Sequence, residues 1–328
     1  MALKSAQFVA PRKIEIVDLP EPDFSEAPPE SVLVQVERTG ICASDMPPFY
    51  QNRPPEAYPF GLGLSLHECV GTVVASNCPR FREGDRVLSF PQGVGGLVER
   101  FRSSSAATIP LPEFQPLEHL LMAQPLGTVI WAMRKLPPLL GKEVVVLGQG
   151  PMGLLLTHVL SNLGARTIVA LDKLDYRLEV ARRMRATHTC NVTRDDPVEA
   201  VREITGGRMA DLVVEAVGQQ TETLNQCLDL VRDRGTILGF GITVENLYPF
   251  RYGEFFRRNL TLIGSVGPEV QHDYPLAVDW ILQGRVQVAP LITHILPFTE
   301  VQRGFELAWE KKDGAIKVIL DHTVSGSP

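Results

Sequence analysis

The sequence lacks the features that mark secreted, membrane-bound and nucleic-acid-binding proteins. Residues 1–16 contain no long apolar run of the kind found in signal peptides, and no apolar stretch reaches the length of a membrane span. Basic residues form neither a run nor a stripe, and the formal net charge is -6. We therefore expect a cytoplasmic protein with a small-molecule substrate, and neither a nucleic acid nor a membrane as partner.

Cysteine is also scarce, and its spacing forms no pattern. The five cysteines, at positions 42, 69, 78, 190 and 227, contain no CxxC pair. This argues against a disulfide framework and for a reducing compartment. No internal repeat or low-complexity segment is present. With 328 residues, 44% of them hydrophobic, the chain is long enough for about two domains with substantial cores.

The strongest positive signal is the stretch 144–153, in which an apolar run leads into Gly148-x-Gly150-x-x-Gly153. The pattern predicts a buried strand, a tight turn and the start of a helix. The first glycine permits the turn, the second lets the backbone approach a pyrophosphate, and the third lets the helix pack on the strand. The positive end of the helix would then face the phosphates. A strand-turn-helix without a ligand gives the same pattern, so the context has to decide.

The following segment supplies that context. An apolar strand at 167–171 ends in Asp172, where a carboxylate can bind both ribose hydroxyls of NAD and would repel the 2′-phosphate of NADP. Arg177 lies five residues further on, and it either reaches the adenosine ribose and pyrophosphate or is a solvated helix charge. Strands are expected near 143–147, 167–171, 187–190, 211–215, 236–239 and 260–264, with helices between them such as 175–184 and 221–231.

The N-terminal third carries a different pattern. Segments 13–17 and 32–36 alternate apolar and polar residues, which predicts half-buried strands. Cys42 and His67 are side chains suited to Zn²⁺. Taken alone they show little, because a buried cysteine is usually a small apolar group and a single histidine is usually a hydrogen-bonded core residue.

A set of motifs in order adds a resemblance. Gly40-Ile41-Cys42-x-Ser44-Asp45 is followed by His67-Glu68, Gly84-Asp85-Arg86-Val87 and Gly95-Gly96-Leu97-Val98-Glu99, before the glycine turn. Over nearly the whole chain this resembles the zinc-type medium-chain dehydrogenases, which include alcohol, polyol, threonine and glucose dehydrogenases. The resemblance implies an α/β fold, a Rossmann doubly wound parallel sheet plus a GroES-like β domain. Residues 1–126 and 287–328 would form the GroES-like catalytic domain, and residues 127–286 the Rossmann NAD-binding domain.

The resemblance also implies roles for single residues. Cys42 and His67 would hold one catalytic zinc ion, with Glu68 close by or as an alternate ligand. Ser44 would take the proton of the substrate alcohol, and Asp45 would orient His67. The cofactor-binding residues would be Gly148, Gly150, Pro151, Met152, Gly153, Asp172, Arg177, Val217, Phe240, Ser265, Val266 and Lys317, the last on the pyrophosphate. Phe240 either packs on the nicotinamide ring or is a core residue.

Three departures from the family pattern qualify this picture. No cysteine lies in residues 88–94, where some members carry a structural zinc lobe, so we expect no structural zinc. The third zinc ligand position holds Gln124, a neutral and weaker donor, as in the archaeal glucose dehydrogenases of the family. Gln124 is either a ligand or a structural amide, in which case zinc is held by Cys42, His67 and Glu68 or is absent. Pro47 stands where a proton-relaying histidine is common.

The sequence thus predicts a zinc-assisted, NAD(H)-dependent alcohol dehydrogenase that oxidises a secondary alcohol, such as a sugar, polyol or hydroxy-amino compound, by hydride transfer. Two alternatives remain at this stage: a metal-free NAD(P)H-dependent quinone or enone reductase, and a catalytically inactive dinucleotide-binding sensor. The family resemblance further implies a homodimer or homotetramer.

Overall fold

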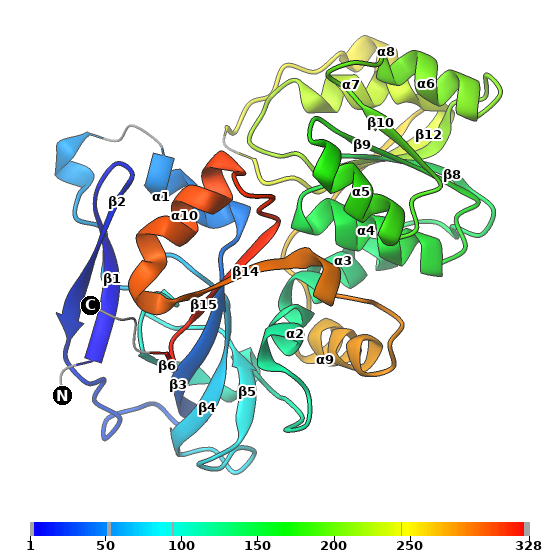
Figure 1. Ribbon diagram of the computed structural model, residues 1–328. Coiled ribbons are helices and arrows are strands. Elements are labelled where there is room, and N and C mark those ends of the chain that lie inside the picture. The colour runs from blue at the N-terminus through cyan, green and yellow to red at the C-terminus, as the bar shows by residue number, and fades with distance from the viewer. Residues whose placement is uncertain (1–2, 51–53, 94, 244, 325–328) are drawn as a thin grey trace. The chain divides into compact units, whose positions relative to one another are not determined.

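The computed structural model describes residues 3–50, 54–93, 95–243 and 245–324 (Figure 1). The chain forms two compact units. The first comprises the described residues up to Pro125, then Glu269–Gln283, then those from Ile292 onward; the second comprises Leu126–Pro268 and Gly284–Leu291. In the described part of the chain, no helix is both long enough and apolar enough to cross a membrane.

The second unit is built on a six-stranded sheet in the order β10-β9-β8-β11-β12-β13, all strands parallel. The strands are β8 (Glu143–Leu147), β9 (Thr167–Asp172), β10 (His188–Asn191), β11 (Ala210–Glu215), β12 (Val231–Gly239) and β13 (Thr261–Gly264). The helices are α4 (Pro151–Asn162), α5 (Asp175–Arg183), α6 (Pro197–Ile204), α7 (Thr223–Leu230) and α8 (Tyr252–Arg257), and α3 (Ala123–Arg134) crosses the division between the units.

This sheet confirms the predicted doubly wound architecture. Helices α4 and α5 pack on β8, β9 and β10, whereas α7 packs on β11 and β12 (Figure 1). All five residues of β8 are buried, as expected for a strand covered on both faces. The strand order reverses at β8, so the carboxyl ends of β8 and β11 border the crevice where ligands bind in open α/β sheets.

The strand boundaries differ most from expectation at β12. The helix predicted for 221–231 ends at Leu230, and β12 begins at the next residue rather than near 236. Val231 pairs with Ala210, but the register shifts before Thr236 pairs with Leu212. The intervening Arg234 has a φ of 57°, which interrupts the regular strand conformation. Hydrophobic periodicity therefore does not predict the residues of β12 that precede it.

The first unit contains a two-stranded β1-β2 sheet and a seven-stranded sheet in the order β14-β15-β3-β4-β5-β7, with β6 paired to β3. The strands are β1 (Leu3–Ala10), β2 (Lys13–Leu19), β3 (Ser31–Gly40), β4 (Glu68–Ser76), β5 (Arg86–Ser89), β6 (Arg100–Ser104), β7 (Thr108–Pro110), β14 (Ile292–Pro297) and β15 (Lys317–Asp321). The helices are α1 (Pro47–Tyr50), α2 (Leu117–Leu121), α9 (Val270–Leu282) and α10 (Val301–Glu310).

The two ends of the chain share one core in this unit. Strand β15 pairs antiparallel with β3, and α10 packs on β2 and β15 (Figure 1). The rings of Phe8, Phe49 and Phe305 meet there, with centroids of Phe8 and Phe305 5.3 Å apart. Aromatic pairs in this geometry stabilise a core beyond the area they bury.

One helix lies in a different unit from the predicted one. The expected boundaries put residues 127–286 in a continuous Rossmann domain, yet Glu269–Gln283 groups with the first unit. The reason is that α9 packs against α2 and β7, and Gln271 donates to the backbone oxygens of Ala106 (2.8 Å) and Thr108 (3.1 Å). A helical period identifies the helix but not the surface that it covers.

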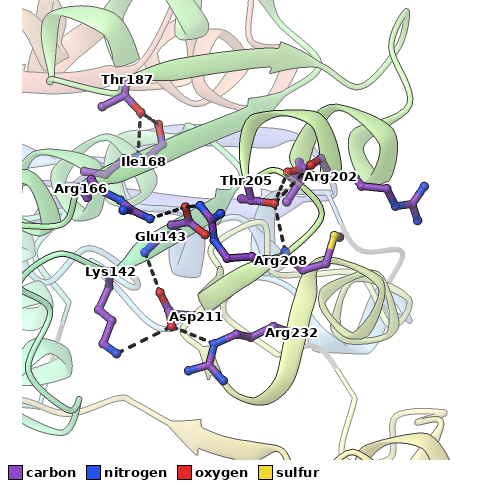
Figure 2. A network of polar contacts seen from close by, with 12 residues as sticks. Lys142, Glu143, Arg166, Ile168, Thr187, Arg202, Thr205, Arg208, Asp211 and Arg232 are labelled. Carbon is purple, nitrogen blue, oxygen red and sulfur yellow. Dashed lines mark hydrogen bonds and ion pairs between the residues drawn. The ribbon is translucent and has the colours of Figure 1, made fainter.

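A network of ion pairs closes the amino end of the parallel sheet (Figure 2). Glu143, the first residue of β8, has a side chain only 6% exposed, and its Oε1 accepts from Arg166 (2.7 Å) and Arg208 (2.6 Å). Asp211 accepts from the backbone N–H of Glu143 (2.9 Å) and from Arg232 (2.8 Å). The network joins β8 to β11, to the start of β12 and to Arg166, which precedes β9.

Replacing Glu143 with glutamine is expected to lower the free energy of unfolding by about 1 to 2 kcal/mol. The amide keeps one acceptor but removes the charge between two guanidinium groups, both of which are largely solvent-exposed and therefore screened. Urea denaturation of the Glu143→Gln protein against the parent chain measures this. An unchanged midpoint and slope of the denaturation curve would show that the ion pairs of Glu143 do not stabilise this end of the sheet.

His322 makes the stability of the first unit depend on pH. Its ring stacks on Phe298 with centroids 4.2 Å apart, and its Nε2 lies 3.1 Å from Thr39 Oγ1. Burial lowers the pKa of His322 from 6.5 to about 3, the carboxylate of Asp321 opposing and Arg38 adding to this effect. Between these two pH values the unfolded chain binds a proton that the folded chain does not.

Stability should therefore be complete above about pH 6.5 and fall as the pH drops toward 3, with a loss from this group of up to about 2 kcal/mol at pH 5. Other groups titrate in the same window, so the comparison is with His322→Gln, which has no ionisable ring. Urea denaturation at pH 7.5 and pH 5 should show a smaller pH dependence in the variant. Equal dependence in both proteins would rule out this role for His322.

Candidate active site

The register of two strands brings the predicted metal ligands together. Gly40 at the end of β3 pairs with Glu68 at the start of β4, so the residues just beyond each strand end meet. Cys42 follows β3, and His67 precedes β4. One ligand atom each from Cys42, His67 and Glu68 lies within 4.8 Å of the other two. Two segments separated by a long proline-rich loop thus converge at one point.

Asp45 holds two of these residues in place. It lies in a short 3-10 turn (Ala43–Asp45) and is 1% exposed. Its Oδ2 accepts from the backbone N–H of Cys42 (2.8 Å), and its Oδ1 lies 3.6 Å from His67 Nδ1. A carboxylate on one imidazole nitrogen sets the ring orientation and leaves the other nitrogen for a metal.

The electrostatics of this cluster favour a cation. Burial lowers the pKa of His67, but hydrogen bonds to Asp45 and Cys42 and the charges of both outweigh it and raise the pKa to about 11. A position at which a histidine holds its proton so strongly is one where the surrounding groups stabilise positive charge. A divalent ion would take the place of that proton.

Glu68 is buried beside a lysine. Both Glu68 and Lys317 are almost fully buried, and the Lys317 ammonium pairs with Glu68 Oε2 and donates to the Ile41 carbonyl (3.0 Å). Gly40 makes room for the pair, because a Cβ there would lie 2.3 Å from Glu68 Oε2. Within the described residues, Glu68 Oε1 has no hydrogen-bond partner.

This arrangement differs from the pyrophosphate contact expected for Lys317. An ammonium that is 1% exposed and bonded to a carboxylate and a carbonyl presents no face to a phosphate in this structure. Its partner in this structure is an acidic residue of the candidate metal cluster, and its contact with the pyrophosphate stays a prediction. Lys317 therefore acts on the position and charge of Glu68.

Ser44 and Gln124 are the two other predicted residues of this unit. Ser44 lies in the same turn as Asp45, and its Oγ is buried with no hydrogen-bond partner among the residues that the structure describes. Gln124 is 6% exposed in the first turn of α3, and its amide nitrogen donates to the hydroxyl of Tyr274 (3.5 Å). Tyr274, from α9, is a residue that the sequence did not point to.

The donor set fits zinc. A thiol, an imidazole and a carboxylate oxygen are the ligands that Zn²⁺ takes in proteins. The unpartnered Oε1 of Glu68 and the cation-favouring surroundings of His67 are what such a site needs. Cys42 and His67 would hold the ion, with Glu68 as the oxygen donor within reach.

The glycine turn in the second unit has the geometry expected of a phosphate loop. Gly148 has a φ of 94°, and a Cβ on Gly153 would lie 1.9 Å from Gly148 O, so both positions require glycine. Gly150 is the N-cap of α4, and Pro151 and Met152 are its first residues. The first N–H groups of an α-helix have no partner within the helix and are available to an anion.

Asp172 and Arg177 lie beside this turn. Asp172, at the end of β9, accepts from the backbone N–H of Gln149 (2.7 Å) and of Leu174 (2.9 Å). Arg177 lies 3.9 Å from Asp172 and 3.7 Å from the position of a Cβ on Gly150. Its side chain is 11% exposed, which excludes the alternative of a solvated helix charge.

The remaining predicted cofactor residues lie at the carboxyl ends of the neighbouring strands. Val217 follows β11, and its side chain lies against Gly148. Phe240 follows β12, and Ser265 and Val266 follow β13. Val266 is 75% exposed, whereas Ser265 Oγ is buried with no hydrogen-bond partner among the described residues. All of these positions lie at the carboxyl edge of the sheet, which is where open α/β sheets generally bind ligands.

Comparison with known proteins places these two sites in a family. Residues 28–113 match the alcohol dehydrogenase GroES-like domain, and residues 151–283 match the zinc-binding dehydrogenases. The chain belongs to the zinc-type medium-chain dehydrogenases. This confirms the predicted family. It also confirms the predicted fold class, a GroES-like domain together with a Rossmann domain.

Relatives match the dehydrogenase over nearly its full length. Sorbitol dehydrogenase of Bacillus subtilis is 26% identical over 97% of both chains. L-threonine 3-dehydrogenase of Caldanaerobacter subterraneus is 27% identical over 93% of this chain and 95% of its own. The solved structure of an alcohol dehydrogenase from Thermus sp. ATN1 is 27% identical, covers 97% of this chain and 99% of its own, and has a TM-score of 0.85. The dehydrogenase is thus an oxidoreductase of the alcohol dehydrogenase type.

Proposed function

We propose that the protein is a zinc-assisted, NAD-dependent dehydrogenase of secondary alcohols. The observation that carries this proposal is the convergence of Cys42, His67 and Glu68 within 4.8 Å, with Asp45 bonded to the first and ion-paired with the second. Glu68 is buried with Oε1 unpartnered among the described residues, whereas Cys42 and His67 are partly exposed, so an incoming ion could reach the three donors.

Each of these residues of the first unit would have a separate role in holding the metal or in catalysis. Zinc, when bound, supplies Lewis acidity that stabilises negative charge on the substrate oxygen. Cys42 and His67 hold it, and Asp45 fixes the ring orientation of His67. Lys317 neutralises Glu68 at one oxygen and leaves Oε1 as a ligand or as a nearby counter-charge. Gln124 adds a neutral donor whose amide nitrogen is already held by Tyr274.

Ser44 is the proposed first acceptor of the substrate proton. Its buried Oγ has no protein hydrogen-bond partner within the described residues, so it is available to a substrate hydroxyl. Pro47 follows in α1 and has no group that passes on a proton. The proton would therefore leave Ser44 through water.

In the second unit, the proposed cofactor is NAD(H) rather than NADP(H). The Asp172 carboxylate lies beside the glycine turn, where it would bind ribose hydroxyls and repel a 2′-phosphate. NAD would accept the hydride from the carbon of the alcohol. Arg177, close to Asp172 and Gly150, would bind the adenosine ribose or the pyrophosphate.

The proposed substrates are sugars, polyols and hydroxy-amino compounds. Two relatives, a sorbitol dehydrogenase and an L-threonine 3-dehydrogenase, are named for compounds of these classes. The test is NADH formation, followed at 340 nm, with a panel of polyols, aldoses, vicinal diols and β-hydroxy amino acids in the presence of zinc. Binding of NADH without turnover of any of these compounds or their carbonyl products would refute the proposed catalysis.

We also infer a homodimer or homotetramer that works in the cytoplasm. Strand β13 is the last of its sheet, and Leu262 within it and Val266 just after it are 42% and 75% exposed. An exposed strand edge with apolar neighbours pairs readily with another chain. Light scattering after size exclusion should give at least twice the chain mass, and a monomer would refute the assembly.

A further inference from the structure

Glu215 is a buried carboxylate with an unusual set of partners. It is the last residue of β11 and is 4% exposed. Its Oε1 accepts from the backbone N–H groups of Val217 (3.0 Å) and Gly218 (3.0 Å), and its Oε2 accepts from the backbone N–H of Gly241 (3.2 Å). Within the described chain, the partners of this carboxylate are thus loop amides rather than basic side chains.

These amides belong to two different loops. Val217 and Gly218 follow β11, whereas Gly241 follows β12. Each carboxylate oxygen binds one loop, so the side chain joins them. The backbone adds to this link, because the N–H of Gln219 donates to the carbonyl of Ile242 (2.7 Å).

The two loops are packed too closely for any side chain between them. A Cβ on Gly241 would lie 2.4 Å from Glu215 Oε2, and a Cβ on Gly218 would lie 2.7 Å from the nitrogen of Ile242. Gly218 also has a φ of 63°. The contact between the loops is therefore fixed in distance as well as in hydrogen bonding, with Glu215 at its centre.

The position of these loops decides which part of a cofactor they would support. Asp172 ends β9, on one side of β8, while β11 and β12 lie on the other side. A dinucleotide with its adenosine ribose at Asp172 and its pyrophosphate at the glycine turn extends its nicotinamide half over β11 and β12. The loops after these strands carry Val217, whose N–H donates to Glu215, and Phe240, which precedes Gly241.

We propose that Glu215 is a positioning residue for the nicotinamide half of the cofactor site. It does not touch the cofactor; it holds the loops after β11 and β12 in the shape that receives the ring. This inference rests on the proposed dinucleotide binding and goes beyond it, because it assigns to one buried acid the preorganisation of one half of the site.

The test compares NADH with ADP-ribose, which lacks the nicotinamide ring but keeps both riboses and the pyrophosphate. In Glu215→Gln, the amide keeps one acceptor oxygen, so one of the two loops loses its hydrogen bond. Titration calorimetry should show NADH binding about tenfold weaker and ADP-ribose binding within about twofold of the parent protein. Gly241→Ala breaks the same contact from the other loop and should show the same selectivity.

The matched control is Glu143→Gln, which removes another buried carboxylate at the opposite end of neighbouring β8 (Figure 2). It should lower thermal stability without changing the ratio of the two affinities. Parent-like NADH affinity in Glu215→Gln or Gly241→Ala, or equal weakening of NADH and ADP-ribose, would overturn the inference. Failure of the parent protein itself to bind NADH would instead refute the proposed function.

Discussion

Replacing Cys42 and His67 together with alanine is expected to remove bound zinc and to lower alcohol oxidation by about three orders of magnitude or more. The two side chains provide the sulfur and nitrogen donors of the cluster, and Glu68, already paired with Lys317, cannot retain the ion alone. Loss of the cation removes several kcal/mol of stabilisation from the developing negative charge on the substrate oxygen.

The double variant should leave the second unit intact. The glycine turn, Asp172 and Arg177 all belong to that unit, so NADH affinity should stay within about twofold of the parent. Zinc content by mass spectrometry, NADH titration and turnover measure the three effects separately. Cys78→Ala is the matched control, because Cys78 is a buried free thiol of the same unit outside the cluster. Undiminished turnover in the double variant would exclude a metal role for these residues.

Replacing Asp172 with alanine should lower kcat/KM for NAD by about a hundredfold and raise the ratio of NADP to NAD activity. The estimate follows from losing two hydrogen bonds from ribose hydroxyls to a carboxylate, at about 1.5 kcal/mol each. Removing the negative charge also removes the repulsion of a 2′-phosphate. The measurement is steady-state kinetics with each cofactor at a fixed, saturating alcohol concentration.

The Asp172 carboxylate also binds backbone N–H groups, so the stability of the Asp172→Ala protein has to be measured as well. Its carboxylate accepts from the N–H groups of Gln149 and Leu174, and part of the loss could come from a loosened glycine turn. Asp175→Ala is the control, since Asp175 is a nearby exposed acid paired with Arg194. A loosened turn would weaken both cofactors equally. An unchanged cofactor ratio would therefore contradict the assignment of Asp172 to the ribose.

Much of the fold could be predicted because the glycine turn and the apolar strand runs are local signals. The six strands of the parallel sheet lie close to their expected positions, apart from the early start of β12. That start depends on a left-handed residue, Arg234, which no hydrophobic period shows. Helix α9 packs against α2 and β7, and such tertiary contacts cannot be found from hydrophobic periodicity.

The candidate site could be predicted only where residue type and motif order were enough. Cys42, His67 and Glu68 were named from their motifs, and the β3-β4 register then explains why they meet. The pairing of Lys317 with Glu68 could not be predicted, because it depends on the space that Gly40 leaves beside Glu68. Glu215 is the last residue of the strand expected at 211–215, but the sequence does not show the role proposed for it, because its partners are backbone amides.

The most direct test of the account is a zinc titration of the chelator-treated protein, with NAD and an alcohol substrate present and NADH formation as the readout. The account predicts negligible activity at first, a linear rise, and a plateau at one zinc ion per chain. Full activity before any zinc is added, or a rate of NADH formation that stays constant as zinc is added, would contradict the account.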